Sequence, residues 1–244
     1  MTTLPDTIDL MAMAAALEAR GGKRRLSGAL RNAWRSQSCL ADLRQAQDIC
    51  GVLDQLTAGP LFIESTLTQI QGSLLASAIL LYARATHTSG SGNERGAITL
   101  DDKKLSAEQR QDHRALIKIR NTALGHVESR AAIEGDMWHV DYLFAKRVSP
   151  DTWSFASASA SIGFNIDAFA MLKRQLPISA DTVAAKARER LDDINKVLKE
   201  ANPSDAAMMR YAVDPVAWFG SVESARMMLD GAPGVEKTSW LPFR

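Results

Sequence analysis

The apolar residues between positions 61 and 85 repeat at helical spacing, and this repeat limits the possible folds more than any other feature of the chain. They follow one another at steps of three or four residues: Ile63, Leu67, Ile70, Leu74, Ala78 and Leu81. An α-helix turns once in about 3.6 residues, so these side chains fall on one face. Leu75, Ile79, Leu80 and Tyr82 widen that face. The pattern predicts a helix from about Leu61 to Ala85, at the centre of a bundle or in a dimer interface.

Weaker helical repeats predict a mainly α fold around this helix. Further helices are expected over residues 7–19, 41–56, 107–124, 166–177 and 180–201. Asp6 or Thr7 is a suitable N-cap for the first of them, and Ser106 with Gln109 has the spacing of a capping box. Pro177 is expected to end one helix because proline cannot donate the helical hydrogen bond. Ser179 or Asp181 would then cap the next.

Residues 137–162 predict a β-hairpin. Met137–Phe144 is rich in aromatic and β-branched side chains, Ser149-Pro150-Asp151 has the composition of a turn, and a second strand is expected over Trp153–Ile162. The expected architecture is a helical bundle over residues 1–202 with this hairpin inserted or appended. Asn202-Pro203-Ser204 marks a boundary, and residues 203–244 form a C-terminal extension that packs on the body or on a partner.

The composition is that of a globular protein, with 46% apolar and 23% charged residues. A net charge of +1 gives no general attraction to nucleic acid, so any basic surface is local, as between Lys23 and Arg35. Cys39 and Cys50 are too few for a disulfide framework. No secretory signal and no apolar run of about 18 to 20 residues is present. We therefore expect a cytoplasmic protein without a membrane partner.

The strongest candidate site is Arg120-Asn121 followed by His126, at the end of the helix that Ser106 begins. Arg120 can bind a phosphate with two hydrogen bonds, Asn121 can position it, and His126 can transfer a proton near neutral pH. Gly125 is expected to end the helix and let His126 fold back towards Arg120. The four histidines lack zinc-ligand spacing, and no phosphate-binding glycine loop is present, so neither a metal nor a cofactor is expected.

The motif Arg120-Asn121-(x4)-His126 resembles that of the HEPN superfamily, and Leu81-Tyr82-Ala83-Arg84 before it resembles the abortive-infection-type branch. The resemblance covers about residues 59 to 127. It implies a HEPN-like helical bundle and a metal-independent endoribonuclease in a toxin or phage-defence role. The implied reaction is attack of a ribose 2′-OH on the adjacent phosphorus, which gives a 2′,3′-cyclic phosphate. Arg120, Asn121 and His126 would be the catalytic residues, and Arg84 a substrate contact.

The resemblance also implies a homodimer with RNA as substrate, and an antitoxin or another defence protein as a further partner. Other interpretations of the same residues stay open. Arg120 and Asn121 could cap carbonyls at the helix end or pair with Asp112 or Glu128, and His126 could cap the helix. The chain would then be a non-catalytic helical interaction module that binds a protein or a nucleotide.

Overall fold

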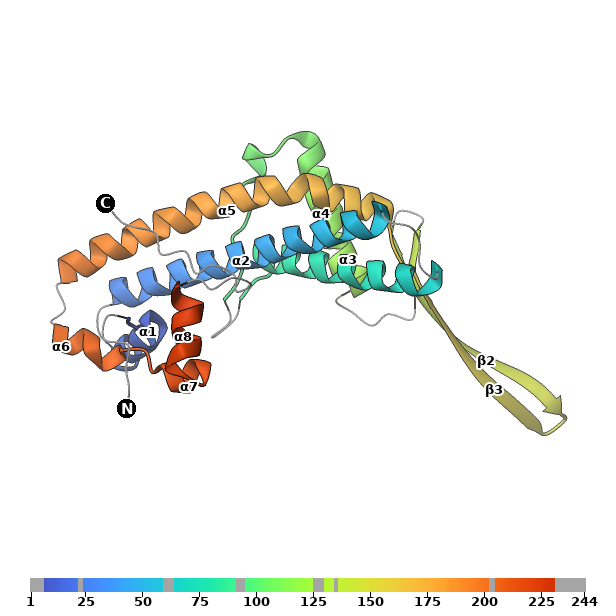
Figure 1. Cartoon of the computed structure of the whole chain (residues 1–244). Helices are drawn as coiled ribbons and strands as arrows, with labels where there is room; N and C mark the ends of the chain where they lie inside the picture. The colour runs from blue at the N-terminus through green and yellow to red at the C-terminus, as the bar shows by residue number, and fades with distance from the viewer. Residues whose placement is uncertain are drawn as a thin grey trace. The chain divides into compact units, whose positions relative to one another are not determined.

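The computed structural model describes residues 7–21, 24–58, 64–90, 95–124, 130–133, 136–201 and 205–230. The fold is mainly helical, as the sequence predicts (Figure 1). It divides into two compact units, residues 1–34 with 190–244 (unit 1) and residues 35–189 (unit 2), and the division falls inside two long helices. The predicted boundary at residues 202–204 lies outside the described residues. The expected domains 1–202 and 203–244 therefore stay a prediction.

Unit 1 joins the N-terminal helix to the C-terminal segment. Its elements are α1 (Leu10–Ala19), the start of α2 (Arg24–Ala58), the end of α5 (Ile166–Ala201), α6 (Asp205–Met208), η3 (Met209–Tyr211), α7 (Pro215–Phe219) and α8 (Val222–Asp230). Its core contains Met13, Ala14, Leu26, Leu30, Ala33, Ile194 and Val197. The N-cap of α1 is Asp9, not Asp6 or Thr7, because the Asp9 carboxylate accepts hydrogen bonds from the Met11 and Ala12 amides at 2.9 Å.

Unit 2 contains the candidate site. Its further elements are α3 (Glu64–Thr86), η1 (Asp102–Lys104), α4 (Ala107–Ile119), η2 (Arg120–Leu124), β1 (Arg130–Ile133), β2 (Asp136–Ser149) and β3 (Thr152–Ser161). Its core side chains come mainly from α2, α3, α4 and α5, and include Leu43, Leu53, Leu75, Ile79, Tyr82, Leu116, Leu172 and Leu176; Ile133 of β1 and Trp138 of β2 join them. The capping box at the start of α4 is confirmed, because Ser106 and Gln109 exchange side chain to backbone hydrogen bonds at 2.8 and 3.1 Å.

The predicted central helix is confirmed as α3, but its buried face differs from the prediction. Ile70 is 48% exposed and Leu80 40% exposed, whereas Leu75, Ile79 and Tyr82 are fully buried. The sequence carries apolar residues around most of this helix, so periodicity alone could not select the face that packs. Contrary to the expectation that no apolar run is long enough, the stretch Thr66–Thr86 is long and apolar enough to cross a membrane, although the core helix of a soluble protein passes the same test.

Two helices are longer than the sequence predicts. α2 begins at Arg24 instead of Ala41, and α5 runs without interruption from Ile166 to Ala201 although it contains Pro177. Proline removes one helical hydrogen bond, and this cost is offset where the helix is packed on both sides of it. Leu172 and Leu176 before the proline and Val183 after it are all buried in the core. The predicted pair of helices is therefore one continuous helix.

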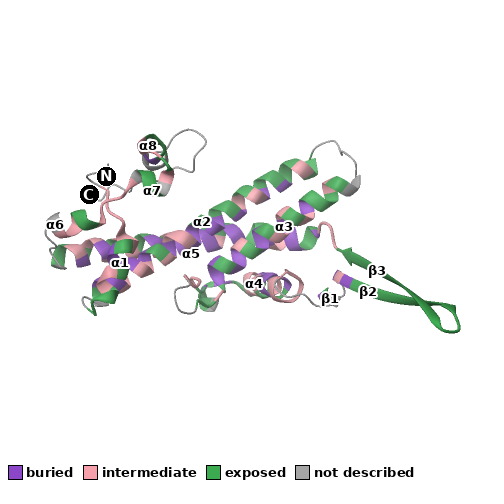
Figure 2. Ribbon diagram, turned by 90° about the horizontal axis from the view of Figure 1, so that it is seen from below, coloured by how far each residue is buried: buried purple, intermediate pink, exposed green. Residues whose placement is uncertain are grey.

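The predicted hairpin is confirmed, and it belongs to a three-stranded antiparallel sheet in the order β1-β2-β3. The sequence analysis missed β1, because its four residues are too few to show an alternating pattern. β2 and β3 extend away from the helices of unit 2 (Figure 1). Every residue from Asp141 to Ser161 is exposed, and Figure 2 shows this part of the hairpin as exposed throughout. We call residues 141–161 the arm.

Candidate functional site

The Arg120-Asn121 pair lies on a turn of π-helix. α4 ends at Ile119, and Arg120–Leu124 continues it as a π turn. Such turns are wider than α-helical ones and occur often at functional sites. Both side chains are half-buried, and Arg120 Nη1 donates a hydrogen bond to Asn121 Oδ1 at 2.9 Å. The two groups that the sequence singled out are therefore held together, with the carboxamide oriented by the guanidinium.

Asn121 lines a cleft of about 550 Å³, which we call the Asn121 cleft. Its walls come from the end of α3, residues 99 and 100, α4 and the π turn. Among its lining side chains are His87, His113, Arg114 and Lys118. Two imidazoles, two cationic side chains and an amide thus face one space. Such a set can bind a phosphate and move protons beside it.

His113 is held in place from the core side. The hydroxyl of Tyr82 lies 2.7 Å from His113 Nδ1, and the two rings meet edge to face with centroids 5.8 Å apart. Burial raises the pKa of Tyr82, so its phenol stays protonated at neutral pH and able to donate. A ring fixed through Nδ1 presents Nε2 as its second proton-transfer atom.

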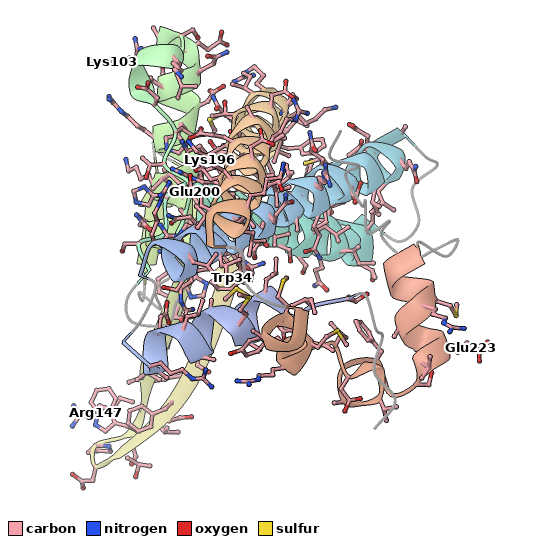
Figure 3. The ribbon with its side chains drawn as sticks, turned by 90° about the vertical axis from the view of Figure 1, so that its left-hand side faces the viewer. Trp34, Lys103, Arg147, Lys196, Glu200 and Glu223 are labelled. Carbon is pink, nitrogen blue, oxygen red and sulfur yellow. The ribbon has the colours of Figure 1, made fainter. Side chains whose placement is uncertain are left out.

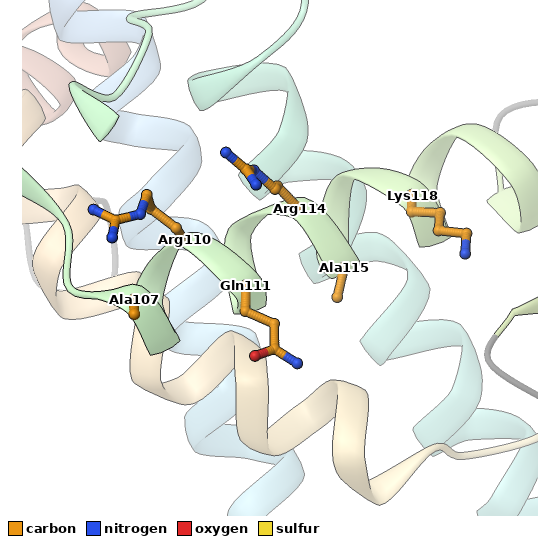
Figure 4. A pocket seen from close by; sticks show the side chains of 6 residues that line it. All are labelled: Ala107, Arg110, Gln111, Arg114, Ala115 and Lys118. Atoms are coloured by element: carbon orange, nitrogen blue, oxygen red, sulfur yellow. The ribbon is translucent and has the colours of Figure 1, made fainter. Parts of the chain in front are cut away.

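α4 carries a local basic surface. Arg110, Arg114 and Lys118 follow one another at steps of four residues and line a shallow pocket of about 280 Å³ (Figure 4). Residues four apart lie on the same side of a helix. Arg114 and Lys118 also line the Asn121 cleft, so the cationic row leads into it.

The basic segment from Lys23 to Arg35 is less available to a phosphate. Arg31 donates two hydrogen bonds to Glu18 at 2.6 and 2.5 Å, and Arg25 forms an ion pair with Glu200 at 2.7 Å. Glu200 and Trp34 are among the side chains labelled in Figure 3. These carboxylates neutralise two of the cations that made the segment basic.

Arg84 is engaged by a carboxylate. Its Nε donates to Asp42 Oδ2 at 2.8 Å, and Arg95 donates to the same oxygen at 2.6 Å and to the Ser38 hydroxyl at 2.7 Å. Asp42 is buried, whereas 58% of the Arg84 side chain is exposed. The hydrogen bonds that Arg84 donates to Asp42 raise the pKa of Arg84. The single charge of Asp42 balances only one of the two guanidinium groups, so this cluster keeps one positive charge that could attract a phosphate. A substrate role for Arg84 stays a prediction.

His126 and Gly125 lie outside the described residues, so the predicted helix break and the return of His126 towards Arg120 stay predictions. Asp112, one alternative partner of Arg120, is bound by Arg174 instead, at 2.8 and 3.0 Å. Glu128 is not among the described residues. Within the described ranges, no group of three or more His, Cys, Asp or Glu side chains could hold a metal ion.

The sequence analysis assigned no role to His87 or His113. A signal for His113 was available, since His113, Ile117 and Asn121 are separated by steps of four and a helix brings such residues to one face. His87 follows α3 and reaches the cleft only through the packing of α3 against α4, which no local pattern reveals. Comparisons of the chain with protein families, with curated proteins and with solved structures found no match in any of the three.

Proposed function

We propose that unit 2 is a metal-independent endoribonuclease of the HEPN type. One observation carries the proposal: the hydrogen-bonded Arg120-Asn121 pair stands on a π turn whose Asn121 faces a cleft with two histidines and two cations. Phosphodiester transfer needs charge stabilisation and proton transfer in one place. The side chains around the Asn121 cleft supply both kinds of group.

In the proposed reaction, a base removes the proton of a ribose 2′-OH, and the O2′ atom attacks the adjacent phosphorus. The P–O5′ bond breaks, and an acid protonates the leaving 5′-oxygen, so that the products are a 2′,3′-cyclic phosphate and a 5′-OH. Arg120 stabilises the added negative charge on the phosphoryl oxygens, and Asn121 positions the phosphate. DNA lacks the 2′-hydroxyl and is inert.

Three histidines are available for the proton transfers. His126 is the one that the motif supplies, and His113 and His87 line the Asn121 cleft. His113 is the better oriented of the two cleft histidines because Tyr82 holds its ring. Arg114 and Lys118 attract the phosphate backbone on either side of the reacting one.

The biological setting follows from the resemblance in the motif. A nuclease of this kind acts as a toxin or in phage defence, works as a homodimer in the cytoplasm, and is silenced or triggered by an antitoxin or another defence protein. The toxin or defence role and the antitoxin depend on the same reaction, so these two parts fail if the chain does not cleave RNA.

The test is cleavage of a structured RNA by the full chain in EDTA. Replacing Arg120, Asn121 or His126 by alanine is expected to lower the rate by at least about 100-fold, the usual effect of a lost acid, base or charge-stabilising group. Arg188→Ala is the matched control for charge, since this arginine is exposed on α5 outside the site. His139→Ala is the control for histidine, since it pairs with Asp141 at 2.9 Å on the sheet.

The same assay separates the histidines. His113→Ala should lower the rate as much as His126→Ala if both transfer protons, and melting temperatures would show that each variant is folded. Cleavage that requires a divalent metal, or that proceeds undiminished in the Arg120 and Asn121 variants, contradicts the proposal.

A further inference from the structure

The arm of unit 2 exposes six large apolar side chains to solvent. Six large side chains on it are between 47% and 78% exposed: Tyr142, Leu143, Phe144, Val148, Trp153 and Phe155. At roughly 200 Å² for each large side chain, this is on the order of 700 Å² of apolar surface in water. A two-stranded hairpin is only marginally stable alone. Because side chains alternate along each strand, this surface is divided between the two faces of the arm: Leu143 and Phe155 lie on one face, Tyr142 and Phe144 on the other. Apolar side chains exposed on both faces indicate an arm that binds a partner.

The two edges of the arm differ in charge. Beyond its short pairing with β1, β2 carries Asp141, Lys146 and Arg147, which are the kind of residues that keep an edge from pairing with other strands. Arg147 also covers the Trp153 ring at 5.6 Å, near the end of the arm (Figure 3). β3 carries no charged residue, no proline and no glycine from Thr152 to Ser161. Within the described ranges, no strand pairs with its outer edge.

An edge without charge is what pairing with an identical strand requires. In an antiparallel pair related by a two-fold axis, each residue lies opposite itself or a near neighbour, so any charge near the centre would face its own copy. The centre of β3 is Ala156-Ser157, inside a run in which alanine and serine alternate from Ala156 to Ser161. Small, uncharged side chains therefore surround the expected two-fold axis.

The faces of the arm support the same arrangement. Tyr142 lies opposite Ala158 and Phe144 opposite Ala156, and the two aromatic rings stack with centroids 5.5 Å apart. A second β3 would place its own alanines next to these, so that the alanine strip lies between two aromatic pairs. Pairing of the two β3 edges would join the arms through backbone hydrogen bonds and bring the aromatic side chains of both copies onto the faces of one wider sheet.

We propose that β3 pairs antiparallel with β3 of a second copy of this chain, so that two arms form one four-stranded sheet. Ten residues on each strand would contribute on the order of ten inter-strand N–H···O=C hydrogen bonds. The proposal goes beyond the ribonuclease activity and does not depend on it, because its readout is molecular mass. Loss of RNA cleavage in the Arg120 or His126 variants would leave it unaffected.

The test is sedimentation equilibrium of the full chain and of two lysine variants. Wild-type protein is expected to be a dimer, and Ser157→Lys to dimerise more than roughly tenfold more weakly, because two like charges meet at the two-fold axis. Leu143→Lys is the matched control. It places the same charge on the same face, directly across from Ser157, but on β2 and away from the free edge.

A mixture of Ser157→Lys with Ser157→Glu tests whether the strand that pairs with β3 is β3 of a second copy. Opposite charges then meet at the axis, so the mixed dimer is expected to form at wild-type affinity or better while each variant alone stays monomeric. Far-UV circular dichroism would verify that all variants keep the fold. The proposal is supported only by this full pattern. A monomeric wild type, a dimeric Ser157→Lys, loss of the dimer in Leu143→Lys or a mixture that stays monomeric overturns it.

Discussion

Replacing Gly72 by alanine should destabilise unit 2, although alanine is normally the better residue inside a helix. Gly72 lies in α3, where its backbone packs against the segment that follows β3. A Cβ atom at this position would lie 1.6 Å from the carbonyl oxygen of Gly163 and 2.6 Å from its carbon. The obstructing atoms belong to the backbone, so no side-chain rotation can relieve the overlap. The segment around Gly163 must move.

The size of the effect follows from two opposing terms. Alanine gains about 1 kcal/mol over glycine in a helix interior, and overpacking costs about 1 to 3 kcal/mol or more. An overlap with backbone belongs at the upper end, so we expect a net loss of about 2 kcal/mol. Gly51 in α2 is the matched control, since no atom lies within 4 Å of its added Cβ. Gly51→Ala should therefore gain about 0.5 to 1 kcal/mol.

Thermal unfolding and urea unfolding, both followed by circular dichroism, measure the stability of the two variants. At about 2 to 4 °C per kcal/mol for a chain of this size, the melting temperature should fall by roughly 6 °C for Gly72→Ala and rise by roughly 2 °C for Gly51→Ala. The slope of the urea dependence should stay unchanged, which shows that the difference is one of stability. If Gly72→Ala proved as stable as Gly51→Ala, the close approach of α3 to Gly163 would be refuted.

Two further predictions concern buried groups of unit 2. Asp42→Asn should lower the free energy of unfolding by about 3 kcal/mol, because it leaves the Arg95 guanidinium, whose side chain is only 12% exposed, without its counterion. Arg84→Ala should cost less than about 1 kcal/mol, because 58% of the Arg84 side chain is exposed. Equal effects of the two substitutions in urea unfolding would contradict this. Burial, followed by the charge of Asp54, raises the pKa of Cys50 to about 11. The folded state then holds the thiol proton more tightly than the unfolded state, so the free energy of unfolding should fall as the pH rises from about 8.5 to about 11, by at most about 1.4 kcal/mol per pH unit. Cys50→Ala should remove this part of the pH dependence, and an unchanged profile in that variant would exclude the cause.

The sequence predicted those elements whose signal is local. The capping box at Ser106, the hairpin turn at Ser149-Pro150-Asp151 and the existence of α3 depend on neighbouring residues, and the structure confirms them. The continuity of α5 through Pro177 depends on core contacts that outweigh a local helix-breaking residue. The face that α3 buries depends on Gly72 and Gly163, where only the folded chain brings two backbones together.

In the candidate site, too, some features follow from neighbouring residues and others only from the packing of the folded chain. The sequence singled out Arg120 and Asn121 because they are adjacent, and their hydrogen bond is a local contact. The π turn that carries them has no sequence signal of its own among the rules for helix ends. His113 belongs to α4 and His87 follows the end of α3, and Tyr82 reaches His113 across 31 residues of sequence. These partners follow only from the packing of α3 against α4.

The most direct test of the central claim is the end chemistry of the RNA that the full chain cleaves in EDTA. We predict fragments that end in a 2′,3′-cyclic phosphate and a 5′-OH, no cleavage of a substrate with a single 2′-deoxyribose at the cut site, and no fragments from Asn121→Ala. Cleavage of the deoxy-substituted substrate, or fragments with a 5′-phosphate, would contradict 2′-OH attack and with it the role given to the Asn121 cleft.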